Sequence, residues 1–303
     1  LRHEGRVVAV AFSPNSKYLA SISWDGLEKV QGLGLPPATL KLWDAATRTE
    51  IGTVPIRQRV SFKRIVFSPG GQILVFEDEG KLHLYTVPSL QPVTNWPGLR
   101  PAYSKDGSAM VYALGKRVVR RNLATGQEVP IGEQSDDVLA LALSPDGGTV
   151  VTSGKDSGGT MTFWDALGQG PPVIVENHLG LVEEVAFSPD GQTLASASWD
   201  GKLGLWNVKE RRTLDLLRGH KGRVTKVAFS PDGRTVATVS SDQTVRLWNL
   251  KTRREVAVLR GHPGEPLAFS PDGQWLASGS IHFWRAPSFE EIAVAQKAKE
   301  ERK

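Results

Sequence analysis

A histidine, a hydroxyl residue and an aspartate recur three times in this chain at the same offsets, and these are the residue types of a hydrolase triad. In such a triad the aspartate orients the histidine, which removes the hydroxyl proton so that the oxygen can attack an acyl group. A single active site does not need three copies, and each copy here is followed by a tryptophan that hydrolysis does not require. The chain also lacks a Gly-x-Ser-x-Gly nucleophile elbow, so we expect no enzyme. The sets are His3, Ser21, Asp25 and Trp43; His178, Ser196, Asp200 and Trp206; and His220, Thr238, Asp242 and Trp248.

Metal and phosphate chemistry find no better support in the sequence. Cysteine is absent, and no His-Glu-x-x-His motif occurs. The segments Gly158-Gly159 and Gly32-Leu33-Gly34 do not resemble a phosphate-binding loop that leads into a helix. Four of the six histidines stand at one position of a repeated pattern, namely His3, His178, His220 and His262. We therefore expect no catalytic, metal or cofactor site.

The repeated pattern is centred on a short turn that recurs about every 40 residues. Four copies read Ser-Pro-Asp-Gly, and three relaxed copies precede them. The first interval is longer because it holds a 12-residue insertion, Leu27–Ala38. The copies begin at Ser13, Ser68, Ser104, Ser144, Ser188, Ser230 and Ser270. Proline presets a type I turn, aspartate can bond its own backbone, and glycine accepts the left-handed conformation.

Each unit has the composition of four short antiparallel strands. In the unit around Ser188, runs over Thr193–Ser198, Lys202–Trp206 and Thr213–Leu217 alternate in polarity and are separated by polar turns. Four strands repeated seven times at this period predict an all-β, seven-bladed propeller.

The strand endings identify a resemblance. Leu42-Trp43-Asp44, Phe163-Trp164-Asp165, Leu205-Trp206-Asn207 and Leu247-Trp248-Asn249, with Gly219-His220 and Gly261-His262, resemble the WD40 family from His3 to about Arg285. The resemblance implies that the three residue sets above are structural tetrads, each linked by hydrogen bonds within one blade. It also implies a protein-binding scaffold whose partner, a protein or peptide, binds the rim that carries the tetrad aspartates.

Some blades depart from the pattern. Blade 4 has Gln134 at the histidine position but keeps Thr152, Asp156 and Trp164. Blades 2 and 3 are degenerate, and we expect them to rely on apolar packing alone. That packing would involve Ile65, Phe67, Leu74 and Phe76 in blade 2, and Met110, Tyr112 and Val118 in blade 3. Such decay can mean relaxed constraint or a specialised contact surface.

The two ends of the chain give further expectations. The propeller should span 1–286, with a helical tail at 287–303 in which Ser288 caps a helix that runs to about Ala298. Blade 7 is short, which suggests that residues are missing between Ser280 and Ile281. Leu1-Arg2-His3 resembles the end of an outer strand. The ending is similar to that of bacterial WD40 proteins with a signalling domain ahead of the propeller, so we expect the C-terminal part of a larger signalling or regulatory protein.

Composition limits the class of partner. With 40% hydrophobic and 23% charged residues the chain is an ordinary globular one, and no apolar run could span a membrane. The net charge of +5 is modest, and no basic stripe with interleaved aromatics favours nucleic acid. We expect a cytoplasmic monomer. The alternative is a propeller that binds nucleic acid or another anionic ligand.

The expected binding residues lie on the rim of the tetrad aspartates. Trp24 and Trp199 directly precede Asp25 and Asp200, and they would either pack against neighbouring loops or serve as aromatic anchors for a partner. Charge around the same rim would come from Arg6, Lys155 and Arg223.

Overall fold

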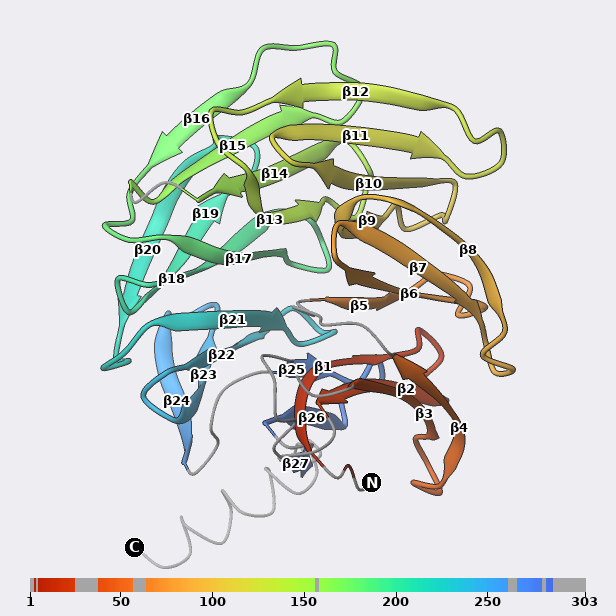
Figure 1. The fold of residues 1–303 in the computed structure, drawn as a ribbon. Helices are drawn as coiled ribbons and strands as arrows, with labels where there is room; N and C mark the ends of the chain where they lie inside the picture. Colours follow the sequence, from red (N-terminus) through yellow and green to blue (C-terminus); the bar gives the residue numbers. More distant parts are fainter. Residues whose placement is uncertain are drawn as a thin grey trace, which may run out of the picture.

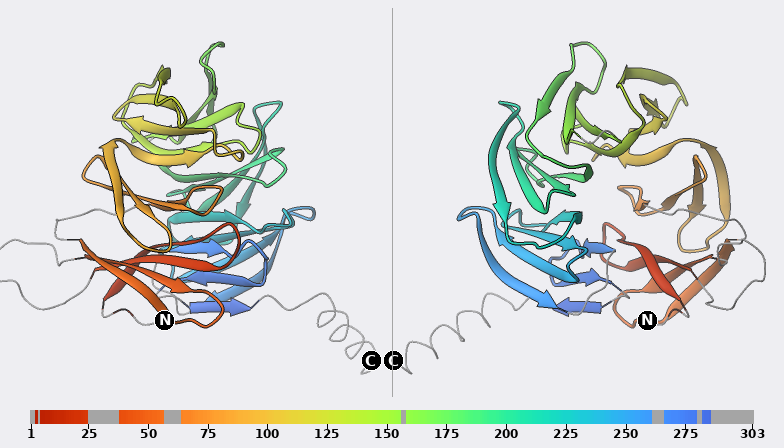
Figure 2. Two further views of the ribbon diagram at one scale, coloured as in Figure 1. Left: turned by 90° about the vertical axis from the view of Figure 1, so that its right-hand side faces the viewer. Right: turned by 60° about the vertical axis from the view of Figure 1, so that its left-hand side comes forward.

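Seven antiparallel sheets follow one another around a ring, and the first lies beside the last (Figure 1, Figure 2). The computed structural model describes residue 3 and residues 5–24, 38–56, 64–155, 158–260, 266–279 and 282–285. Blades 1 to 6 have four strands each, and blade 7 has three within the described residues. The seven-bladed propeller predicted from the repeat is confirmed. No helix in this part of the chain is long and apolar enough to cross a membrane.

The strands of the first four blades run in sequence order from the centre outward. Blade 1 comprises β1 (Arg6–Phe12), β2 (Tyr18–Trp24), β3 (Ala38–Asp44) and β4 (Glu50–Ile56). Blade 2 comprises β5 (Ile65–Phe67), β6 (Ile73–Asp78), β7 (Lys81–Thr86) and β8 (Pro92–Pro97). Blade 3 comprises β9 (Leu99–Tyr103), β10 (Ala109–Leu114), β11 (Arg117–Asn122) and β12 (Glu128–Glu133). Blade 4 comprises β13 (Val138–Leu143), β14 (Thr149–Gly154), β15 (Thr160–Asp165) and β16 (Val173–Glu176).

The remaining blades repeat this order. Blade 5 comprises β17 (Val182–Phe187), β18 (Thr193–Ser198), β19 (Lys202–Asn207) and β20 (Arg212–Arg218). Blade 6 comprises β21 (Val224–Phe229), β22 (Thr235–Ser240), β23 (Thr244–Asn249) and β24 (Arg254–Arg260). Blade 7 comprises β25 (Leu267–Phe269), β26 (Trp275–Ser278) and β27 (His282–Arg285). Ser278 pairs with His282, so the last two strands are short, as the sequence suggested.

The hydrophobic core is divided into seven clusters, and each cluster fills the seam between two adjacent blades. Between blades 4 and 5, for example, Phe163 and Val151 pack against Leu194 and Trp206. The last seam, between blades 7 and 1, is filled by residues from both ends of the sequence, including Ala277 and Trp43. Each sheet therefore buries both of its faces, which explains why the second strand of most blades is almost wholly apolar or small.

The repeated turn closes each inner hairpin through its own side chains. In blade 5 the Ser188 hydroxyl donates to Asp190 at 2.6 Å and accepts the amide of Thr193 at 2.9 Å. Gly191 has φ of 71°, the left-handed conformation that the sequence predicted for this position. These turns lie at the ends of the strands opposite the tetrad aspartates, so the ring has two chemically different rims.

Several expectations fall outside the described residues. These are the helix from Ser288 to Ala298 and the tail at 287–303, the junction of Ser280 and Ile281, and most of the insertion Leu27–Ala38.

Candidate protein-binding site

The tetrad of blade 5 forms a continuous chain of hydrogen bonds. The indole N–H of Trp206 donates to Ser196 Oγ at 2.8 Å, and Ser196 Oγ lies 2.8 Å from His178 Nε2. His178 Nδ1 lies 3.0 Å from Asp200 Oδ2. The Asp200 carboxylate can only accept, so the hydrogen on Nδ1 points to it, and the Ser196 hydroxyl, which accepts the indole N–H, can donate its own proton to Nε2.

Blade 6 repeats this geometry, and blade 1 varies it. In blade 6, Trp248 donates to Thr238 at 2.9 Å. His220 Nε2 lies 2.8 Å from the Thr238 hydroxyl, and His220 Nδ1 lies 3.0 Å from the Asp242 carboxylate. In blade 1, Trp43 donates to Ser21 at 2.7 Å, and His3 Nε2 lies 2.6 Å from the same hydroxyl. His3 Nδ1 contacts Ser23 Oγ at 2.6 Å, while Asp25 lies outside the described residues.

These hydroxyls cannot act as nucleophiles. Ser21, Ser196 and Thr238 are completely buried, and each already accepts an indole proton, so no substrate can reach these oxygens. Across the described part of the chain, no three His, Asp or Glu side chains are grouped to hold a metal ion. The His–Ser–Asp sets serve the fold.

The aspartates remain charged and fix the backbone of the rim. Burial disfavours the charged form of Asp200, but His178 and the amides of Leu179 and Lys202 outweigh it and hold the pKa of Asp200 well below its usual range. The pKa of Asp242 is also lowered, because Thr244 and the amide of Lys221 outweigh burial. Each carboxylate also accepts the backbone amide of the residue that follows the tetrad histidine, and this bond fixes that residue, Leu179 or Lys221, at the rim surface.

Trp199 lies at this surface between blades 5 and 6. The Arg223 guanidinium stacks over the Trp199 indole ring at 4.0 Å, and the indole N–H donates to Glu183 at 2.5 Å. Trp199 is 37% exposed, and the nearby Leu179, whose amide donates to Asp200 at 3.1 Å, is 83% exposed. We call Leu179, Glu183, Trp199 and Arg223 the rim patch. It presents apolar surface in a charged setting, as protein-binding hot spots do.

The other expected binding residues are not part of this patch. Trp24 is half-buried and packs against the core cluster between blades 1 and 2. Arg6 is exposed and lies opposite Trp24 in the β1–β2 pairing. Lys155 forms an exposed ion pair with Asp137 at 3.0 Å. The structure therefore brings Trp199 and Arg223 together, and it leaves Trp24, Arg6 and Lys155 in other blades.

Comparisons with known proteins agree with this geometry. The family model described as "WD domain, G-beta repeat" matches residues 1–27, 127–165, 171–207, 211–249 and 253–282, more than half of the chain. The chain belongs to the WD40 family. The serine-threonine kinase receptor-associated protein of Gallus gallus is 28% identical over 223 residues, which cover 71% of this chain and 59% of that protein. WD repeat-containing protein 55 of Homo sapiens is 35% identical over 109 residues, which cover 36% of this chain and 26% of that protein.

The chain thus aligns with less than two thirds of the length of these relatives. They are vertebrate proteins, so the comparisons place the chain among WD40 proteins without marking it as a bacterial type. The WD40 model leaves residues 28–126 unmatched, which is where the sequence predicted degenerate blades 2 and 3.

The expectation that these two blades rely on apolar packing alone is wrong. In blade 3, Tyr112 donates to Glu128 at 2.6 Å, and Arg121, which stands at the tryptophan position, also donates to Glu128 at 2.6 Å. Arg121 stacks over Trp96 of blade 2 at 4.6 Å. A charged triplet therefore replaces the tetrad, although the predicted apolar residues are all buried. In blade 4, Gln134 takes the place of histidine by accepting a hydrogen bond from Thr152 at 2.7 Å.

A buried ion pair at the seam of blades 2 and 3 was also missed. Glu77 is 1% exposed and accepts both the backbone amide of Arg100 at 2.6 Å and its guanidinium at 3.2 Å. Arg100 has φ of 58°, a strained conformation that this carboxylate supports. Arg64 reaches across to the carbonyl of Leu141 in blade 4 at 2.6 Å. Charge at the inner-strand position of Arg64 and Arg100 was no clear sequence signal, because blades 5 and 6 carry Glu184 and Lys226 at the same position.

Proposed function

We propose that this propeller is a non-catalytic scaffold that binds a partner protein through the rim patch. The observation that carries the proposal is the exposed Trp199 ring, fixed on one side by Arg223 and at its N–H by Glu183, beside the exposed Leu179. A pre-positioned aromatic ring loses little side-chain entropy on binding, which favours its use as an anchor. Arg6 and Lys155 would contribute charge farther around the same rim, and Trp24 would support it by packing.

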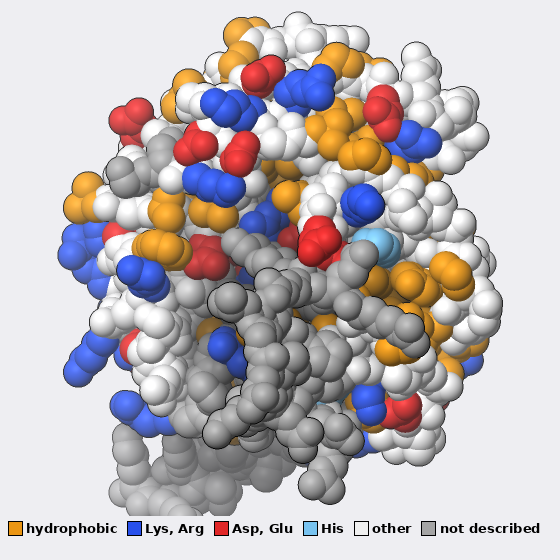
Figure 3. Space-filling model, in the orientation of Figure 1, with side chains coloured by type: hydrophobic (Ala, Val, Ile, Leu, Met, Phe, Trp, Pro, Cys, Tyr) orange, Lys and Arg blue, Asp and Glu red, His pale blue; other side chains and the backbone are white. Residues whose placement is uncertain are grey.

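The finer parts of the proposal extend the resemblance to the WD40 family. We propose a monomeric propeller that works in the cytoplasm as part of a larger signalling or regulatory protein. The absence of cysteine agrees with a reducing compartment. Figure 3 shows Lys and Arg side chains mixed with Asp and Glu on the visible face, and this mixture offers no support for the nucleic-acid alternative.

Affinity capture with matched variants tests the scaffold. Blade 6 has serine where blade 5 has Trp199 and lysine where blade 5 has Leu179, so Trp199→Ser and Leu179→Lys use residues that the fold already accepts. The control is Ile174→Lys, which changes an apolar residue of 63% exposure on the outer strand β16. Proteins retained from native lysate by the wild type and Ile174→Lys, but lost with both rim variants, support the proposal. Identical retention by all four proteins, with unchanged melting temperatures, contradicts it.

A further inference from the structure

The face opposite the rim patch carries a ring of contacts between successive Ser-Pro-Asp-Gly turns. At five seams the proline of one turn lies so close to the glycine of the next that an added Cβ would come within 4 Å of the proline ring. The pairs are Pro14–Gly71, Pro69–Gly107, Pro145–Gly191, Pro189–Gly233 and Pro231–Gly273. At the seam of blades 7 and 1, Ser16 replaces glycine and accepts the amide of Asp272 at 3.1 Å.

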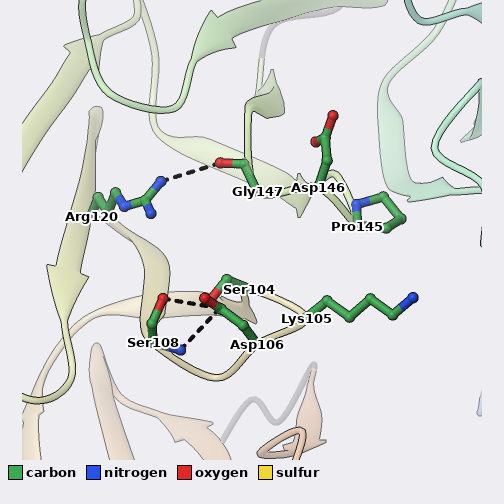
Figure 4. Close-up of a pocket in the computed structure, with 8 residues that line it drawn as sticks. All are labelled: Ser104, Lys105, Asp106, Ser108, Arg120, Pro145, Asp146 and Gly147. Atoms are coloured by element: carbon green, nitrogen blue, oxygen red, sulfur yellow. Dashed lines mark hydrogen bonds between the residues drawn. The ribbon is translucent and has the colours of Figure 1, made fainter.

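The ring is interrupted between blades 3 and 4. Lys105 stands where all the other turns have proline. Gly147 of the next turn therefore faces Ser104 instead of a proline ring. An open pocket of about 360 Å³ occupies this seam. It is lined by Ser104, Lys105, Asp106, Ser108, Arg120, Pro145, Asp146 and Gly147 (Figure 4).

A second departure from the repeat contributes to the same pocket. Arg120 precedes the tryptophan position of its blade, where every other blade has leucine or phenylalanine. Its guanidinium donates to the Gly147 carbonyl at 3.2 Å, across the seam. Figure 4 shows Arg120 and Lys105 at opposite ends of the space between the two turns. Within the described residues, neither cation has a carboxylate partner.

The two carboxylates of the pocket are already committed to their own turns. Asp106 Oδ1 accepts the Ser104 hydroxyl at 2.6 Å and the Ser108 amide at 3.1 Å, and Asp146 Oδ1 accepts the amide of Gly148 at 3.0 Å. The turns of blades 5, 6 and 7 contain the same aspartate. What distinguishes this seam is therefore the pair of unpaired cations.

An exposed apolar residue lies in a neighbouring turn of blade 4. Leu167 is 54% exposed at a position where blades 5 and 6 have Lys209 and Lys251. Its neighbour Ala166 donates to the Gly148 carbonyl at 3.0 Å, next to the pocket wall. Three departures from the repeat thus meet at one seam and combine positive charge with apolar surface.

We propose that this seam binds an acidic and apolar segment of a second partner protein, with Arg120 and Lys105 each binding one carboxylate at its own end of the pocket and Leu167 contacting the apolar side chain. The nearby charges of Asp106 and Asp146 favour a monoanionic carboxylate over a dianionic phosphate. The site lies on the rim opposite the rim patch, so one propeller would join two partners.

A defined probe tests this site without knowledge of the partner. A fluorescein-labelled nine-residue peptide of alternating glutamate and leucine is titrated with the protein at low salt, and anisotropy is followed. Arg120→Leu and Lys105→Pro restore the residues of the other blades, so both should fold. We expect Arg120→Leu to weaken binding about tenfold, as for loss of a charge-assisted hydrogen bond. Lys105→Pro, which removes a more exposed charge, should weaken it about threefold.

The controls separate this site from the rim patch and from general charge effects. Trp199→Ser and Lys209→Ala should bind the peptide as the wild type does, whatever becomes of the scaffold function. A peptide with phosphoserine in place of glutamate tests whether the site prefers phosphate to carboxylate. A peptide with lysine in place of glutamate tests whether the leucines alone account for the binding. The proposal is overturned if Arg120→Leu and Lys105→Pro both bind the peptide as tightly as the wild type does. It is also overturned if either substitute peptide binds more tightly than the glutamate peptide, or if the wild type does not bind the glutamate peptide.

Discussion

Removing the central hydroxyl of the blade 5 tetrad should cost more stability than any single exposed contact. Ser196→Ala leaves the buried N–H of Trp206 without its acceptor and His178 Nε2 without its donor, and both bonds are 2.8 Å long in the structure. A buried polar group that loses its partner costs about 1–3 kcal/mol, so the two together should lower the free energy of unfolding by about 3 kcal/mol. Ser89→Ala, at an exposed turn, should stay within about 0.5 kcal/mol of the wild type.

A double-mutant cycle shows whether this loss comes from the hydrogen bond. Trp206→Phe removes the donor, and in the Ser196→Ala background it also removes the unpaired N–H. The double variant should therefore be more stable than the sum of the single losses by about 1 kcal/mol. Urea unfolding followed by far-ultraviolet circular dichroism measures all four proteins without relying on tryptophan fluorescence. Additive losses, or a Ser196→Ala variant as stable as Ser89→Ala, would refute the tetrad argument.

Other perturbations test single features of the fold. Burial and the charge of Glu79 raise the pKa of Asp78 to about 6, so the contribution of Asp78 to stability falls as pH rises from about 4 to about 6. Asp78→Asn should remove this loss and stabilise the protein at pH 7.5 by about 1–2 kcal/mol, as measured by denaturant titration. Glu77→Gln should destabilise by about 3 kcal/mol because Arg100 stays buried without its anion, and adding Arg100→Met should recover part of that loss. Gly180→Ala places Cβ 2.9 Å from the amide of Asp200 and should lower the melting temperature, whereas Gly70→Ala, with nothing within 4 Å, should not.

The regular blades could be predicted from the sequence because their signals are local. The turn at Ser188 sets the hairpin, and the alternation that follows predicted a strand over Thr193–Ser198, which is β18. The partners of the buried hydroxyls could be anticipated in the same way, because each set keeps the same offsets within one blade. Proline, aspartate and glycine at fixed positions leave little choice of backbone.

Contacts between blades could not be predicted, because no local pattern specifies them. Trp24 and Trp199 occupy the same repeat position, yet one packs into the core and the other stays at the surface. The difference lies in their neighbours: Trp199 meets Arg223 of the following blade, 24 positions along the chain. The Glu77–Arg100 pair likewise depends on a left-handed residue in an inner strand, which nothing in the flanking sequence indicates.

Blade 3 has exchanged its tetrad for other contacts. Relaxed constraint alone would leave the positions of the lost histidine, serine and tryptophan without new polar contacts. Blade 3 instead joins Tyr112, Arg121 and Glu128, and its seam with blade 2 is closed by a buried ion pair. Charged contacts need particular geometry to offset desolvation, so they persist only where each partner is kept. The departures of Lys105 and Arg120 occur in this same blade and also converge on one place. Blade 3 is therefore better explained as a specialised blade than as a decayed one.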